Sequence, residues 1–143
     1  MKIDDVIAGR QASDVITVSA DAPVRDAVAV LAQKRIGALP VLDGDAVVGI
    51  FSERDVIYRL ASEGSVCLDR TIAEVMTSPA ITVERDTMAD QALGLMTKRR
   101  VRHLPVIDAT GMCGFISIGD LVKSRFDEVQ HEAEAMRDYI AHA

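Results

Sequence analysis

Apolar and polar residues are ordered along the first half of the chain in a pattern that predicts a short series of regular elements. After the strand-like triplet ITV at 16–18, apolar residues recur at the i, i+3, i+4, i+7 spacing of a helix from Val24 to Leu31. Asp21 is suited to cap this helix, and Pro23 fits its first turn. Two apolar runs follow, ALPVLD and VVGIFS, joined by DGDA as in a hairpin. The predicted order is strand, helix, strand, strand, helix.

The same order occurs a second time. An offset of 65 aligns 15–57 with 80–122 without a gap and with thirteen identical positions, which is typical of a duplicated structural unit. A weaker repeat precedes each copy, IDDVI at 3–7 and IAEVM at 72–76, and here the offset is 69. The first lead-in is therefore four residues longer, and the segment AGRQAS is expected to absorb the difference. Because so short a hairpin is not stable alone, we expect an α/β (α+β) fold of two β-α-β-β-α modules packed as a pseudo-twofold pair.

The repeat divides the chain into a first module at 1–64, a second module at 65–126 and a C-terminal amphipathic helix at 127–143. Apolar residues spaced by four and three positions form one stripe along the end of the chain: Val122, Phe126, Val129, Ala133, Met136 and Ile140. Such a stripe packs either on its own module or on a second chain. The expected oligomer is a homodimer.

Composition and charge narrow the class of protein. The chain has 143 residues and a net charge of −6, which disfavours nucleic acid and anionic membranes as partners. Cys67 and Cys113 form neither a CxxC pair nor a disulfide framework. The start, MKIDDVIAGR, lacks the apolar core of a secretory signal, and no apolar run approaches the length of a membrane span. We therefore expect a cytoplasmic protein.

No set of catalytic or metal-binding residues stands out in the sequence. His103 precedes Leu-Pro at the start of a strand, and neither cysteine has a visible base partner. His131 lies among glutamates in a helical stretch, where surface ion pairs are the expected arrangement. The basic run KRRVRH at 98–103 begins with cations that complement a helix end, and 3% aromatic residues offer few stacking platforms for nucleic acid. We predict that the protein is not an enzyme and binds no metal.

Two phrases carry the candidate chemistry, GIFSERDV at 49–56 and GFISIGDL at 114–121. Each places an aspartate three residues after a serine at the start of a predicted helix. One interpretation is a capping box, in which the two side chains satisfy free N–H groups at the helix start. In the other, the helix N-terminus and serine bind a phosphate while the aspartate accepts hydrogen bonds from a ribose. The spacing permits both.

The two gapless copies of ITV, LPV and the serine–aspartate phrase resemble a tandem of cystathionine β-synthase (CBS) domains, a Bateman module. Together with TKRRVRHLPVID and the terminal EAEAMRDYIAHA, the chain is similar to the stand-alone bacterial signalling proteins built of one CBS pair. The resemblance implies a regulatory sensor that binds AMP, ADP, ATP, NAD(H) or S-adenosylmethionine between its modules. An unidentified protein target is a further implied partner. The alternative is a structural adaptor without a small-molecule ligand.

The resemblance also implies that each cleft is shared between the modules. The first cleft would combine Ser52, Arg54 and Asp55 with Pro79, Ala80, Ile81, Arg100, Val101, Arg102 and His103. The second would combine Ser117, Gly119 and Asp120 with Val15, Ile16, Thr17, Ile36, Gly37 and Ala38. The first cleft would be cationic and prefer the more phosphorylated ligand, while the second would be open and accept adenosine or a bulkier dinucleotide.

Overall fold

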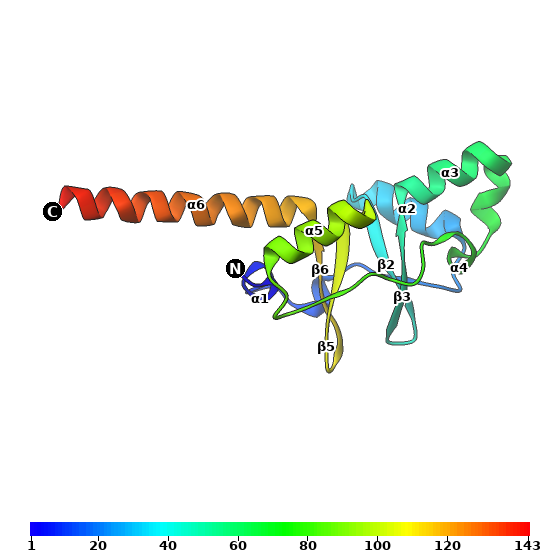
Figure 1. Ribbon diagram of the computed structural model, residues 1–143. Coiled ribbons are helices and arrows are strands. Elements are labelled where there is room, and N and C mark those ends of the chain that lie inside the picture. Colours follow the sequence, from blue (N-terminus) through cyan, green and yellow to red (C-terminus); the bar gives the residue numbers. More distant parts are fainter.

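The computed structural model describes residues 1–143 and contains two similar modules side by side (Figure 1). The first module is built of β1 (Val18–Ser19), α2 (Val24–Lys34), β2 (Ala38–Asp43), β3 (Ala46–Ser52) and α3 (Glu53–Glu63). The second module is built of β4 (Val83–Glu84), α5 (Ala89–Arg99), β5 (His103–Asp108), β6 (Gly111–Ser117) and α6 (Ile118–Ala141). The predicted order of strand, helix, strand, strand, helix is confirmed in both.

Each module has one three-stranded mixed sheet, and the strand registers repeat. The order is β1-β2-β3 in the first sheet and β4-β5-β6 in the second. The first pair of each sheet is parallel, with Val18 opposite Val41 and Val83 opposite Val106. The second pair is an antiparallel hairpin that carries an irregularity at the same place in both copies. The sequence repeat therefore corresponds to a repeat of structure, residue for residue.

The start of α2 differs from the expected one. The helix begins at Val24 with Pro23 at the N-cap, so the prediction that Asp21 caps it is wrong. The amide of Asp21 instead donates to Oγ of Ser19 at 3.4 Å, within a turn. The amide of Val24 donates to the carbonyl of Arg70 at 2.8 Å. The turn at Ser19 holds the segment before α2, and Arg70, which follows the first module, binds the first amide of the helix. The helix therefore starts after Pro23.

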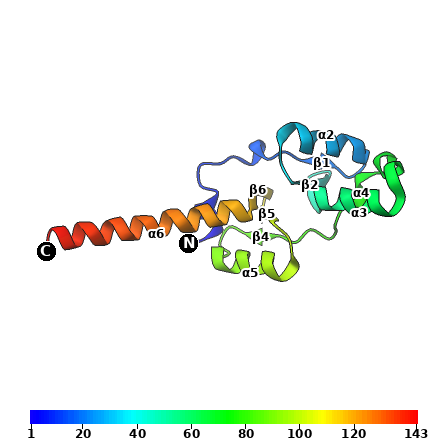
Figure 2. The same cartoon turned by 90° about the horizontal axis from the view of Figure 1, so that it is seen from above.

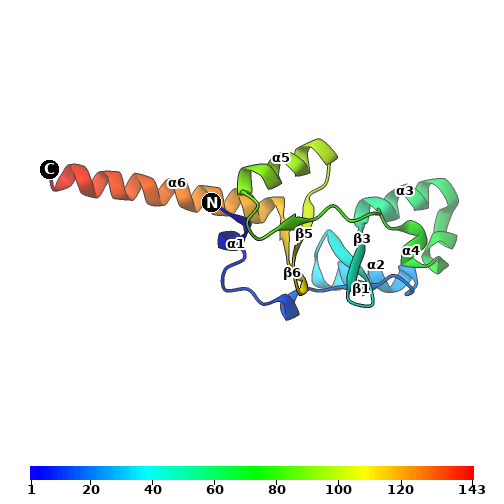
Figure 3. The ribbon, with the colours of Figure 1, turned by 60° about the horizontal axis from the view of Figure 1, so that its bottom comes forward.

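The short helices before the two modules are exchanged between them. The helix α1 (Ile3–Val6) packs in the core of the second module, whereas α4 (Ile72–Val75) packs in the core of the first. The first amide of α1 donates to the carbonyl of Thr87, and the first amide of α4 donates to the carbonyl of Ala22, both at 2.8 Å. Figure 3 shows α1 beside the second module, far from α2. Each module is therefore completed by the lead-in of the other.

The exchange places the segment after α4 across strand β3. The amide and carbonyl of Ile50 pair with those of Thr77, at 3.0 and 2.9 Å. This close approach requires a glycine next to Ile50, because a Cβ at Gly49 would lie 2.6 Å from Sδ of Met76 and 2.8 Å from the carbonyl oxygen of Thr77. The glycine at the start of the serine–aspartate phrase thus serves the crossing of the lead-in.

The last helix, α6, is continuous over 24 residues and projects from the body of the protein (Figures 1 and 2). Leu121 in its first turn is buried in the second core, but the predicted stripe beyond it is exposed, with Phe126 at 65% and Ile140 at 66%. The possibility that this stripe folds back onto its own module is therefore wrong. No helix combines the length and apolar character that crossing a membrane requires.

Candidate functional site

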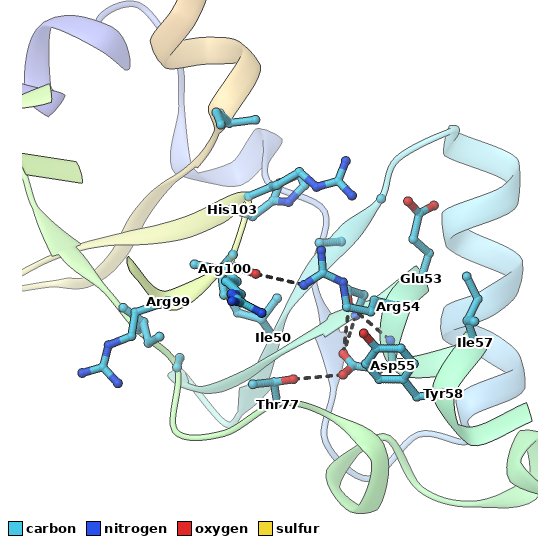
Figure 4. Close-up of a pocket in the computed structure, with 18 of the residues that line it drawn as sticks. Ile50, Glu53, Arg54, Asp55, Ile57, Tyr58, Thr77, Arg99, Arg100 and His103 are labelled. Atoms are coloured by element: carbon cyan, nitrogen blue, oxygen red, sulfur yellow. Dashed lines mark hydrogen bonds between the residues drawn. The ribbon is translucent and has the colours of Figure 1, made fainter. Parts of the chain in front are cut away.

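A cavity of about 740 Å³ lies between the modules, where the start of α3, the segment after α4 and the loop before β5 meet (Figure 4). All residues predicted for the first cleft line it: Ser52, Arg54, Asp55, Pro79, Ala80, Ile81, Arg100, Val101, Arg102 and His103. The structure therefore brings residues 79–81 and 100–103 to the same cavity as Asp55, although both segments are far from it in the sequence.

Asp55 lies at the N-terminus of α3, which Ser52 caps. The amide of Ser52 donates to Oδ2 of Asp55 at 2.9 Å, and the amide of Asp55 donates to Oγ of Ser52 at 3.4 Å. The capping-box interpretation is therefore confirmed here. The other carboxylate oxygen, Oδ1, accepts from the hydroxyl of Thr77 at 2.9 Å. Oδ2 also accepts from the hydroxyl of Ser52 at 3.1 Å. A carboxylate has about four acceptor positions, so one stays free at Asp55, and the two hydroxyls can rotate to release theirs.

Arginines from both modules line the cavity. Nη1 of Arg54 donates to the carbonyl of Arg100 at 2.9 Å, which links the start of α3 to the end of α5 across the cavity. Arg100 adopts a left-handed backbone with φ of 56° and ends α5, and the chain turns there toward Arg102 and β5. Arg99 also lines the cavity, while Glu53 and Asp55 are its acidic residues. The cavity is therefore predominantly cationic, as predicted for this cleft.

His103 is the histidine of the basic wall of the cavity, which we define by its lining residues Arg54, Arg99, Arg100, Arg102 and His103. Its ring stacks on Phe115 with centroids 5.3 Å apart, and it lines the cavity at the start of β5. Burial and the neighbouring Arg102 lower the pKa of His103 below its ordinary value, although Asp120 and Glu53 act in the opposite direction. His103 is therefore neutral at pH 7 and contributes an N–H group and no charge.

The second serine–aspartate phrase forms the same capping box but has a different partner. The amide of Ser117 donates to Oδ2 of Asp120 at 2.8 Å, and the amide of Asp120 donates to Oγ of Ser117 at 3.1 Å. Arg10 lies on this carboxylate, with Nη2 at 3.0 Å from Oδ1 and Nη1 at 3.3 Å from Oδ2. Burial alone would raise the pKa of Asp120, but the bonds from Arg10 and Ser117 outweigh it and lower that pKa.

The other residues predicted for the second cleft are distributed over several places. Gly37 and Ala38 line the first cavity, and Ile36 packs against the first core. The segment 15–17 directly follows η1 (Ala12–Asp14), which contacts β6. Arg10 lies on Asp120, so the second cleft, which the sequence predicts to be open, has an ion pair that the sequence did not predict.

Arg10 and Thr77 are the residues that sequence reasoning missed. Arg10 lies in the lead-in that is four residues longer than its counterpart, so the length difference was the available signal. Thr77 directly follows the weak repeat at 72–76 and contacts Asp55 because the lead-ins are exchanged. Neither residue belongs to a periodic pattern or a recognised motif, which is why both were overlooked.

The protein is thus a tandem of two copies of one α/β module. The lead-ins of the copies are exchanged, and a cavity large enough for a small-molecule ligand lies between them. The sequence profile of the CBS domain matches residues 5–62 and 72–127, and this chain belongs to the CBS domain family. It is a tandem CBS pair similar to stand-alone bacterial CBS-domain proteins.

Among curated proteins, the mitochondrial CBS domain-containing protein CBSX3 of Arabidopsis thaliana is 36% identical over 125 residues, covering 84% of this chain and 61% of that protein. Inosine-5′-monophosphate dehydrogenases match through their CBS part alone. The enzyme of Mycobacterium tuberculosis is 36% identical over 115 residues, which are 78% of this chain and 21% of the enzyme. The chain thus spans less than two thirds of these relatives.

Solved structures agree with the fold. A CBS-domain-containing protein from Agrobacterium tumefaciens superposes with a TM-score of 0.81 at 34% identity, covering 87% of this chain and 99% of that one. CBSX2, solved in complex with AMP, gives a TM-score of 0.74 at 25% identity over 88% of this chain and 96% of that one. A CBS pair solved with 5′-methylthioadenosine and S-adenosyl-L-methionine gives 0.73 at 25% identity, over 86% and 98%.

Proposed function

We propose that this chain is a non-catalytic sensor that binds an adenine nucleotide, such as AMP, ADP, ATP or NAD(H), in the cavity beside Asp55. The observation that carries the proposal is the convergence of the Asp55 carboxylate, several arginines and apolar residues in a single cavity of about 740 Å³. That volume lies within the range of roughly 300–1,000 Å³ that small-molecule sites occupy. The complexes of CBSX2 with AMP, and of another pair with S-adenosyl-L-methionine, support an adenosine ligand.

Each group of the cavity suits one part of such a ligand. Asp55 accepts hydrogen bonds from the two ribose hydroxyls, which an ionised carboxylate does well. Arg102 and His103, with Arg54, contact the phosphate. The segment 79–81 and Val101 pack against the purine and bond its edge through main-chain groups. The ligand thus contacts both modules at once, so its occupancy favours one arrangement of the pair over others.

A thermal-shift screen with AMP, ADP, ATP, NAD⁺, NADH and S-adenosylmethionine tests the proposal. A nucleotide present at 100 times its dissociation constant stabilises the folded state by about 2.7 kcal/mol, so the melting temperature rises by several degrees. Guanosine and cytidine nucleotides are the matched controls for phosphate binding alone. An unchanged melting temperature with every adenosine ligand contradicts the proposal and leaves the adaptor as the function.

The exposed stripe on α6 supports a homodimer as the functional unit. Its apolar residues recur at the four-and-three spacing of a helix seam, and Val122, Phe126 and Met136 are each more than half exposed. Pairing two copies of this helix would bury the stripe. Light scattering on the full chain and on a chain ending at Lys123 tests the dimer. A full-length monomer contradicts it, and a truncated chain that stays dimeric excludes α6 from the interface.

A further inference from the structure

The two modules differ most in what their lead-ins bring to the two aspartates. The lead-in after α4 brings a threonine hydroxyl to Asp55, with Oγ1 at 2.9 Å from Oδ1. The lead-in after α1 brings the guanidinium of Arg10 to Asp120, with contacts of 3.0 and 3.3 Å to the two carboxylate oxygens. The same capping box therefore faces a neutral, rotatable group in one cleft and a fixed cation in the other.

The position of Arg10 follows from the longer first lead-in. After α1 the chain turns at Gly9, whose φ of 82° is in the left-handed region that favours glycine. The amide of Arg10 donates to the carbonyl of Ile7 at 3.0 Å, which fixes the turn, and η1 follows directly. The corresponding segment after α4 is four residues shorter and carries no arginine. The extra residues thus form the turn that places Arg10 against Asp120.

Both aspartates accept three hydrogen bonds, but two of those at Asp55 come from rotatable hydroxyls, whereas two of those at Asp120 come from the charged fork of Arg10. At Asp120, Oδ1 accepts from Nη2, while Oδ2 already accepts from the amide of Ser117 and from Nη1. A ribose diol offers two neutral donors, and a bidentate guanidinium offers two charged ones with matching geometry. Arg10 is also tethered next to the carboxylate, so it competes at high effective concentration. A ribose could reach Asp120 only by displacing it.

We propose that Arg10 closes the second cleft, so that each chain binds its adenine nucleotide in the Asp55 cleft alone. This inference rests on the proposed function. It assigns to Arg10 the role of an internal competitor for the ribose, which makes one of two duplicated sites inactive. The side chains of Arg10 and Asp120 are 47% and 27% exposed, so the pair is accessible and can be opened by substitution without loss of the fold.

Isothermal titration with AMP on Arg10→Ala tests the inference. We expect about one AMP per chain in the unaltered protein and about two in Arg10→Ala. The affinity of the Asp120 cleft for AMP should be at least about tenfold higher in Arg10→Ala than in the unaltered protein. Arg25→Ala is the matched control, because Arg25 forms an exposed ion pair with Asp69 at 3.2 Å on the far helix α2. It removes the same charge and should leave the stoichiometry unchanged. Arg10→Gln should behave as Arg10→Ala does.

A companion titration on Asp55→Ala identifies the site. Without Arg10 substitution this variant should bind AMP about ten- to a hundredfold more weakly, and with Arg10→Ala it should keep about one tight site, at Asp120. Two AMP per unaltered chain, or one AMP whose affinity is unchanged by Asp55→Ala, overturns the inference, while binding of a nucleotide by this chain stands. A stoichiometry that stays at one in both Arg10 variants also overturns it. If neither the unaltered protein nor any variant binds AMP, ADP, ATP or NAD⁺, the proposed function and this inference are both contradicted.

Discussion

The clefts at Asp55 and Asp120 have the same local design and different surroundings. Both aspartates are the third residue of a capped helix, and both accept a bond from the serine amide, at 2.9 and 2.8 Å. Only Asp55 opens onto the large cavity, and only Asp120 carries an arginine. The helix starts are alike because each caps its own helix, whereas the lead-ins differ by four residues and bring different groups to the two aspartates.

The largest effect that would sharpen this comparison is expected from removing the two aspartates in turn. Asp55→Ala should weaken AMP binding about ten- to a hundredfold, because the lost hydrogen bonds to an ionised acceptor are worth roughly 1.5–3 kcal/mol. Asp120→Ala should leave AMP affinity within about twofold, since its cleft is closed. Titration calorimetry measures both. Equal losses in the two variants would show that the clefts are equivalent and contradict the comparison.

The basic wall of the first cleft should distinguish ligands by their phosphates. Arg102→Ala should weaken ATP binding by about tenfold and adenosine binding hardly at all, because a charge-assisted contact is made to phosphate alone. Arg25→Ala serves again as the control for the loss of one positive charge. Titrations with ATP, AMP and adenosine on each variant give the answer. If ATP and adenosine lose affinity equally, the arginine supports the fold of the cleft and does not bind phosphate.

Much of this arrangement follows from periodicity and repetition in the sequence. The gapless alignment of the copies predicted the paired sheets, and the cation-rich loop before β5 was predicted to border Asp55 because of the resemblance to CBS pairs. The contact between Arg10 and Asp120 could not be derived, because it depends on the path of an irregular turn around Gly9. The cap of α2 was missed for a similar reason: Ser19 and Arg70 fix the preceding turn through contacts that local propensity does not encode.

A smaller effect is expected from pH, through His103. Burial and Arg102 hold the pKa of His103 below its ordinary value, so the free protein has a neutral ring at pH 7. A bound phosphate favours the protonated ring and raises that pKa, so binding takes up protons and should tighten severalfold as pH falls from about 8 to about 6. His103→Ala controls for titration of the ligand itself. The same pH dependence with and without the imidazole would exclude His103 from the phosphate site.

The smallest effect should be the same in both modules. Ser52→Ala and Ser117→Ala each remove one side-chain acceptor from a helix start, which lowers the free energy of unfolding by about 1 kcal/mol. Chemical denaturation without nucleotide measures the loss. A large difference between the two variants would mean that the duplicated helix starts do not share one structural role.

We have proposed that one adenine nucleotide binds at Asp55 while Arg10 keeps Asp120 occupied. A crystal structure of the protein grown with AMP would show both features at once. We expect electron density for the ribose on Asp55, for the phosphate near Arg102, and for an undisturbed Arg10–Asp120 pair. Density for AMP on Asp120 with Arg10 displaced, or a cavity at Asp55 without AMP, would contradict it.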